Sequence, residues 1–344
     1  MIRFSSDYTE GAHPSILSAL AETNYEQNPG YGEDPHCTRA AALIREACDA
    51  PDASVHFLVG GTQTNTIVIS SLLKPYEGVL CADNGHINVH ETGSVEATGH
   101  KVLALPSRLG KVTADQIRSA YENHIQDASF EHIVRPGMVY ISHPTEYGTL
   151  YTLKELTALS EVCRTLGLPL FLDGARLGYG LASPETDVAL TDIARLCDVF
   201  YIGGTKVGAL FGEAVVFSTP SLAKNFRYMM KRGGGMLAKG WLLGLQFEQL
   251  FDNGLYQKLG AHAVSLAFRI RDAFREKGIT FIMESPTNQQ FPILTKAQMN
   301  TLGAEFAYTL WEKVDEDRSA VRFCTSWATK EADVEKLIDA IRTL

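Results

Sequence analysis

The sequence predicts an α/β protein whose largely parallel sheet is covered by helices on both faces. Short apolar runs that resemble buried strands alternate with amphipathic segments between about residues 37 and 217. Strands that alternate with helices form βαβ units, and their crossover helices cover both faces of a parallel sheet. With 344 residues, 45% of them hydrophobic, the chain can form a large core or two unequal domains.

The elements of the larger part follow in a regular order after a polar, turn-rich start. We expect a helix over residues 37–49, then a strand over 55–59 that ends in Gly60-Gly61-Thr62, from which a helix continues to about residue 73. Further strands are expected at residues 79–82, 101–105, 138–142, 168–172, 199–202 and 214–217, and a helix at 153–166.

The pattern changes after residue 224 and indicates a second domain. Residues 236–279 have helical periodicity, and they are followed by expected strands at 279–283 and 321–324 and expected helices at 302–314 and 331–343. We therefore predict a large domain with an N-terminal arm over residues 1–240 and a smaller α+β domain over residues 241–344.

Bulk properties exclude several classes of function. The net charge is −9 without a basic block, which argues against nucleic acid or an anionic membrane as a partner. We find no apolar signal core at the start and no run long enough to cross a bilayer. The six cysteines form no CxxC pair, so we expect no zinc cluster or disulfide framework, and a cytoplasmic location.

The most informative residues are Asp173 and Lys206, each at the end of an apolar strand. Ligands of parallel sheets gather at the carboxyl ends of the strands, where Gly61 also falls. An acid and a lysine there suit pyridoxal phosphate (PLP), which needs an amine for its aldehyde and a carboxylate to keep its ring nitrogen protonated. The alternatives are a helix N-cap or a salt bridge to Arg176 for Asp173, and a surface lysine for Lys206.

The turn Gly60-Gly61-Thr62 is a candidate phosphate site. Glycines permit close approach of the backbone, and the N-terminus of the following helix offers free N–H groups. The alternative is a tight turn followed by a threonine N-cap. The turn is neither a GxGxxG motif nor a Walker loop, which counts against nicotinamide and nucleotide cofactors.

Other candidate side chains come from loops and from the second domain. His86 follows the strand at 79–82 and could stack on a flat cofactor ring and act as a base, or it could be a structural histidine. Its spacing from His90 also permits metal binding, but no HExxH pattern is present, and we predict no metal site. Ser6, Arg176 and Arg322 could clamp a carboxylate, since arginine binds carboxylates through two parallel bonds. For Arg322 the alternative is an ordinary surface arginine.

The glycine run Gly233-Gly234-Gly235 follows two cations, Lys231 and Arg232. It could place Arg232 against a phosphate. The alternative is a flexible interdomain loop whose charges are solvated.

Together these motifs resemble the L-threonine aldolases, which belong to the β-eliminating lyase group of the aspartate-aminotransferase-like PLP enzymes. The resemblance extends from Ser6 to about Arg322, and its most specific part is Asp-Gly-Ala-Arg with the downstream lysine. The matching motifs are Ser6-Asp7, Tyr31-Gly32-Glu33-Asp34-Pro35, Gly61-Thr62, Gly85-His86-Ile87, Asp173-Gly174-Ala175-Arg176, Lys206 and Gly233-Gly234-Gly235-Met236. The segment 142–149 resembles the low-specificity subgroup.

The resemblance implies fold type I with a seven-stranded sheet, and it implies roles for single residues. Lys206 would bind the cofactor aldehyde, Asp173 would pair with the ring nitrogen, and His86 would stack on the ring. Cofactor contacts are also implied for Gly60, Gly61, Thr62, Arg176 and, from a neighbouring subunit, Arg232. Substrate contacts are implied for Ser6, Tyr31, Arg176 and Arg322.

The activity implied is cleavage of β-hydroxy-α-amino acids such as threonine and allo-threonine to glycine and an aldehyde, by a homodimer or homotetramer. The relatives' Thr-His pair that touches the substrate hydroxyl has His143 as its nearest counterpart here. The alternatives are a PLP-dependent lyase that performs β-elimination on another amino acid, and a catalytically silent protein that retains the fold.

Overall fold

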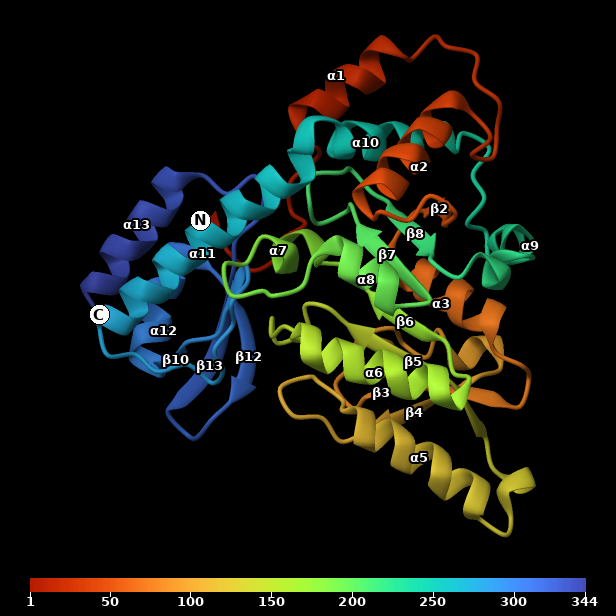
Figure 1. Cartoon of the computed structure of the whole chain (residues 1–344). Coiled ribbons are helices and arrows are strands. Elements are labelled where there is room, and N and C mark those ends of the chain that lie inside the picture. Colours follow the sequence, from red (N-terminus) through yellow and green to blue (C-terminus); the bar gives the residue numbers. More distant parts are fainter.

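The computed structural model describes residues 1–344, and its central element is a seven-stranded sheet (Figure 1). The strand order is β2-β8-β7-β6-β5-β3-β4, and only β8 runs antiparallel to its neighbours. The strands are β2 (Ser54–Leu58), β3 (Glu77–Ala82), β4 (Lys101–Leu105), β5 (Arg135–Ser142), β6 (Leu170–Asp173), β7 (Val199–Gly203) and β8 (Glu213–Phe217). The predicted seven-stranded, mostly parallel sheet is therefore confirmed.

Helices cover both faces of this sheet, as predicted (Figure 1). Alternate residues of one strand enter separate apolar clusters: Leu170 and Leu172 of β6 face one helical layer, and Phe171 between them faces the other. The first layer holds α2 (Pro35–Ala47), α5 (Ala114–Gln126), α6 (Leu153–Leu166), α8 (Leu190–Leu196) and α10 (Trp241–Phe251). The second layer holds α3 (Gly61–Leu72) and α9 (Phe226–Arg232). The uninterrupted apolar runs of the sequence follow from this double coverage.

The C-terminal part packs a small antiparallel sheet against two helices. Its strand β13 (Arg318–Cys324) pairs with β9 (Gln289–Gln290), β10 (Ile293–Thr295) and β12 (Thr309–Lys313). The helices are α11 (Leu255–Glu276) and α13 (Glu331–Arg342), with α12 (Lys296–Gly303) beside β10. The N-terminal strand β1 (Ile2–Arg3) pairs with β11 (Phe306–Ala307), so the first residues of the chain join this part.

Helix α10 packs against α2 and against α1 (Pro14–Glu22), although it follows the predicted boundary at residue 240. Helix α11 then contacts both α10 and α13. The division into residues 1–240 and 241–344 stays a prediction. None of the helices combines the length and the apolar character needed to cross a bilayer.

Two predicted elements of the C-terminal part are wrong. The helix predicted at 302–314 ends near its start, at Gly303 in α12, and β11 and β12 follow. This segment is rich in aromatic and β-branched residues, and pairing of β12 with β13 determines its conformation. The strand predicted at 279–283 is reduced to a single bridge between Phe281 and Pro292. The N–H of Ile282 donates to Phe291 and that of Ile293 donates to Thr280, whereas the carbonyl of Pro292 faces the other way and accepts from Val321 of β13.

Candidate active site

A cavity of about 220 Å³ opens at the carboxyl edge of the parallel strands. Seven residues predicted from the sequence line it: Gly60, Gly61, Thr62, His86, Asp173, Arg176 and Lys206. Its polar lining further includes Ser142, Glu146, Tyr201, Thr205 and Glu213. Residues from six stretches of the chain therefore meet in one place, at the strand ends where parallel sheets bind their ligands.

Asp173 is the last residue of β6 and is buried. Its carboxylate accepts hydrogen bonds from the hydroxyl of Tyr140 (2.5 Å), the hydroxyl of Tyr201, the side-chain amide of Asn65 (3.1 Å) and the backbone N–H of Ala175 (3.0 Å). Burial alone would raise the pKa of Asp173, but the positive charge of His86 and these donors outweigh it, and the pKa is lowered. Asp173 is thus held as a carboxylate inside the protein.

Lys206 lies in the loop after β7, and the hydroxyl of Tyr179 donates a hydrogen bond to its backbone carbonyl. No carboxylate lies within ion-pair distance of its amine, which is 5.9 Å from the centre of the Tyr8 ring. Burial and the neighbouring charge of Arg176 lower the pKa of Lys206. Both effects favour the neutral, nucleophilic amine.

Two glycines bring the Asp173 and Lys206 loops together. The N–H of Gly203 donates to the carbonyl of Gly174 (3.0 Å), so the two backbones are in direct contact. A Cβ atom at Gly174 would lie 1.9 Å from the carbonyl oxygen of Tyr201, and one at Gly203 would lie 2.4 Å from that of Ala175. Any larger residue would separate the acid from the lysine.

The Gly60-Gly61-Thr62 turn begins helix α3 at Gly61. Gly60 is the N-cap residue and offers no side-chain acceptor, so the N–H groups of the first turn have no capping partner. The alternative of a threonine N-cap is therefore wrong here, because Thr62 already lies inside the helix. Free N–H groups and the positive end of the helix dipole at a cavity wall suit an anion.

His86 begins the short helix α4 (His86–Val89), and its Nδ1 lies 2.7 Å from Oε1 of Glu91. Glu91 is itself buried and accepts from Asn65 (2.7 Å) and Ser94 (2.8 Å). Burial opposes the charged imidazole, but the bond to Glu91 outweighs it and raises the pKa of His86. Asn65 also contacts Asp173, so one amide connects the supports of the histidine and of the acid.

Arg176 is not paired with Asp173, which was one alternative. Its Nε and Nη2 donate instead to the carboxylate of Asp7, at 2.7 and 3.0 Å. Burial opposes both charges, but each stabilises the other, so the pKa of Asp7 falls to about 2 and that of Arg176 is raised. Arg176 remains cationic at the wall of the cavity.

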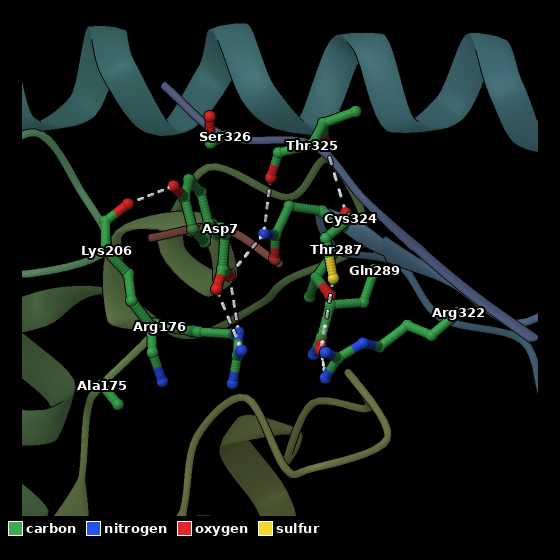
Figure 2. Close-up of polar contacts among 12 residues, drawn as sticks. Asp7, Ala175, Arg176, Lys206, Thr287, Gln289, Arg322, Cys324, Thr325 and Ser326 are labelled. Atoms are coloured by element: carbon green, nitrogen blue, oxygen red, sulfur yellow. Dashed lines mark hydrogen bonds and ion pairs between the residues drawn. The ribbon is translucent and has the colours of Figure 1, made fainter. Parts of the chain in front are cut away.

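Arg322 and Ser6 are not among the residues that line the cavity, but both lie near Arg176. Nη2 of Arg322 donates to the carbonyl of Ser5 (3.0 Å), and Nη1 donates to Oε1 of Gln289 (3.2 Å). Figure 2 shows the guanidinium groups of Arg176 and Arg322 extending toward each other, with the Lys206 amine on the same side. Ser6 lies between the two residues that hold these arginines, Ser5 and Asp7.

Tyr31 and Arg232 lie outside this cavity. Tyr31 lines a second cavity of about 200 Å³, and its ring centre is 4.6 Å from the amine of Lys231. Arg232 is the exposed last residue of α9. Within one chain, the structure therefore does not bring these two residues to Lys206.

His143 also faces away from the cavity. It is fully buried, its Nδ1 accepts from the backbone N–H of Tyr151 (3.3 Å), and burial lowers its pKa to about 4. Its neighbour Glu146 lines the cavity instead and accepts from the Ser142 hydroxyl (3.0 Å).

Comparison with known proteins agrees with this geometry. The profile of the family described as beta-eliminating lyase matches residues 3–297. The chain belongs to the β-eliminating lyase family. It is 32% identical to the low specificity L-threonine aldolase of Pseudomonas sp. (strain NCIMB 10558), over 99% of this chain and 97% of that protein. Its counterpart in Pseudomonas aeruginosa is 29% identical, over 99% and 96%.

Solved structures agree with the similarity to threonine aldolases. A Leishmania major threonine aldolase superposes with a TM-score of 0.97 at 45% identity, over 100% of this chain and 99% of that one. A Thermus thermophilus aspartate aminotransferase shares the fold, with a TM-score of 0.73 at 13% identity, over 100% of this chain and 92% of that one. The predicted threonine aldolase resemblance and the aspartate-aminotransferase-like fold are both confirmed.

In this family member, sequence reasoning missed several residues of the site. It assigned no role to Asp7, Tyr140, Tyr201, Asn65, Glu91, Glu146 or Glu213. Tyr201 stands in the same string as Lys206, and Asp7 stands in the Ser6-Asp7 motif, so a local signal existed for both. No such signal marks Tyr140, which resembles a core residue of a strand, or Asn65, which resembles one of several polar residues in the first turns of a helix.

Proposed function

We propose that this protein uses PLP to cleave β-hydroxy-α-amino acids such as threonine and allo-threonine into glycine and an aldehyde. The observation that carries the proposal is the convergence of Lys206, Asp173, His86 and the uncapped start of α3 on one cavity. The similarity to the threonine aldolases of Pseudomonas and Leishmania major adds the substrate class.

The residues present fit PLP. The uncapped N–H groups at Gly61 and Thr62 would hold its phosphate, and the carboxylate of Asp173 would accept a bond from its protonated ring nitrogen. His86 would flank the ring, and the amine of Lys206 would bind the aldehyde. When bound, PLP supplies an electron sink for the pair released from the Cα–Cβ bond of the substrate.

The substrate carboxylate would bind between Arg176 and Arg322. Asp7 fixes the orientation of the Arg176 guanidinium, and the Ser5 carbonyl does the same for Arg322. Two fixed cations hold the carboxylate so that the bond to be broken keeps one orientation relative to the cofactor ring. Ser6, between Ser5 and Asp7, would add a hydroxyl donor.

The hydroxyl proton of the substrate would be taken by His86, directly or through a water molecule. The bond from Nδ1 to Glu91 leaves Nε2 of His86 as the nitrogen that can accept a proton. Ser142 and Glu146 are the polar residues of the cavity on either side of His143 in the sequence, and we assign contact with the hydroxyl to Glu146 in place of His143.

Arg232 and Tyr31 would act across a subunit interface. Both lie away from the cavity of their own chain, which supports the expected homodimer or homotetramer with shared sites. The buried, unpaired cysteines agree with the expected cytoplasmic location.

The test is a product assay on the purified protein with threonine, allo-threonine and phenylserine. Glycine with the matching aldehyde supports the proposal, whereas pyruvate or another keto acid with ammonia from cysteine-like or aromatic amino acids would indicate β-elimination. Lys206→Ala should abolish both the activity and the visible absorbance of lysine-bound PLP. Lys258→Ala, at an exposed lysine bonded to the Asn253 carbonyl, is the matched control and should change neither. A Lys206→Ala protein that keeps both signals contradicts the assignment.

A further inference from the structure

Glu213 is a buried acid of the cavity for which the proposed reaction has no use. It is the first residue of β8, where it lies opposite Leu58 of β2 and Gly203 of β7. It therefore lies at the edge where β2 continues into the turn at 60–62 and β7 continues toward Lys206. The residue is 3% exposed and lines the same cavity.

No cation forms an ion pair with Glu213, and its hydrogen-bond partners are neutral. The hydroxyl of Thr205 donates to Oε1 (2.9 Å), and the N–H of Gly204 donates to Oε2 (3.2 Å). A second N–H, that of Gly212, donates to Oγ1 of Thr205 (3.0 Å). A buried carboxyl without a counter-charge favours its protonated form.

The charged and titratable groups that face Glu213 are Lys206, Asp173 on β6, Tyr201 on β7 and Tyr256 on α11. Tyr201 donates to Asp173, and Tyr256 donates to the carbonyl of Gly203, so neither hydroxyl donates to Glu213. In the proposed function the Lys206 amine is engaged by the cofactor aldehyde. Burial, reinforced by the negative charge of Asp173, raises the pKa of Glu213 to about 8.

A phosphate group bound at the start of α3 would favour the protonated form of Glu213 further. It carries close to two negative charges above pH 7, and an ionised Glu213 in the same cavity would repel it. A protonated Glu213 can donate from Oε1 to Oγ1 of Thr205. Both acceptor positions of that hydroxyl are then filled, by Glu213 and by Gly212, and its hydrogen is free to bond the phosphate.

We infer that Glu213 keeps a proton while the cofactor phosphate is bound, and that loss of this proton weakens retention of the cofactor. The inference rests on the proposed use of PLP. Because linkage is reciprocal, phosphate binding must also strengthen the hold of Glu213 on its proton. The protein would therefore bind PLP tightly at neutral pH and release it under alkaline conditions.

The experiment compares PLP with pyridoxal, which has the aldehyde but no phosphate. Dissociation constants of both are measured on cofactor-free protein between pH 7 and pH 9.5, and their ratio isolates the phosphate contribution from the titration of Lys206. For the natural protein, the preference for PLP should fall by up to about tenfold per pH unit above pH 8. For Glu213→Gln, which is neutral and of the same shape, it should stay constant within about twofold. The matched control is Glu77→Gln, at another buried glutamate, which begins β3; it should behave like the natural protein.

A constant preference in the natural protein, or an equal fall in Glu213→Gln, overturns the inference while PLP binding stands. Failure of the natural protein to bind PLP at any pH overturns the proposed function instead. If Glu213→Gln does not fold, the infrared difference spectrum of the natural protein decides. A protonated-carboxyl band that strengthens on binding inorganic phosphate at pH 8.5 supports the inference, and the absence of such a change contradicts it.

Discussion

Asp7 and Arg176 are 169 positions apart in the chain, yet they form a buried ion pair with two parallel bonds of 2.7 and 3.0 Å (Figure 2). The amide of Asn288 donates to the same carboxylate (2.8 Å). Asp7 therefore joins the N-terminal arm, the loop that follows Asp173 and the C-terminal part. One carboxylate fixes the orientation of a cation at the cavity and connects three segments of the fold.

Asp7→Asn should destabilise the protein strongly. The substitution leaves the buried Arg176 guanidinium without a counter-charge, and removal of one partner of a buried pair costs about 3–5 kcal/mol. Urea unfolding checks this prediction. The control is Asp315→Asn, since the Asp315–Arg318 pair is exposed and solvent screens its charges. If both variants lose the same free energy of unfolding, the buried pair contributes no more to stability than the exposed pair does.

The same pair predicts how stability depends on pH. The pKa of Asp7 is about 2 in the folded protein and 3.8 without its partners, so its contribution is complete above pH 3.8 and is lost as the pH falls toward 2. Between pH 5 and pH 3 the natural protein should lose about 1 kcal/mol more than Asp7→Asn. Urea unfolding at several pH values in this range measures the difference, and parallel curves would contradict the prediction.

Arg322→Lys should impair substrate binding more than turnover. Lysine keeps the charge but lacks the planar fork that the Ser5 carbonyl and Gln289 orient. We expect KM for threonine to rise by about tenfold to a hundredfold, which corresponds to about 1.4–3 kcal/mol, with a smaller fall in kcat. Arg318→Lys, at the exposed start of the same strand, is the control and should leave KM unchanged. An unchanged KM in Arg322→Lys would remove Arg322 from the carboxylate site.

Glu91→Gln should move the acid limb of the pH profile. Glu91 raises the pKa of His86, so a base at His86 becomes active only above that raised value. Loss of the negative charge lowers the pKa, and the acid limb of kcat/KM should shift to lower pH while the maximum rate falls. Steady-state kinetics between pH 5 and pH 9 test this, and a profile that keeps its acid limb would exclude His86 as the proton acceptor.

Residues of the candidate site could be predicted from the sequence where a recognisable pattern lies directly beside them in the chain. Asp173, Lys206 and Gly61 each follow an apolar strand, and parallel strands bring their carboxyl ends to one edge whatever the order of the strands. The fold class followed from the same alternation of strands and helices. Local patterns therefore sufficed wherever the topology obeys a general rule.

The rest depends on contacts between distant segments. The partner of Arg176 is set by where the N-terminal arm lies, and this arm is held by pairing of β1 with β11 near the end of the chain. The strand β12 was mistaken for a helix because its conformation comes from pairing with β13. Likewise, the sequence around Tyr140 indicates only a core residue of a strand, and only the structure shows that its hydroxyl donates to Asp173.

Arg232 offers a test of whether sites are shared between subunits. If it reaches the phosphate of a neighbouring subunit, Lys206→Ala and Arg232→Ala should each lose activity, but a mixed dimer regains one complete site. That site combines Lys206 of one chain with Arg232 of the other. Random mixing of equal amounts should restore about a quarter of the sites.

Specific activity after joint refolding of the two variants measures this recovery. The control mixes Lys206→Ala with Asp173→Asn, because Lys206 and Asp173 line the cavity of one chain and no mixed dimer can then contain a complete site. Recovery in the first mixture and not in the second establishes that Arg232 acts across an interface. If neither mixture recovers, Arg232 does not complete a neighbour's site, and its exposed position at the end of α9 serves another purpose.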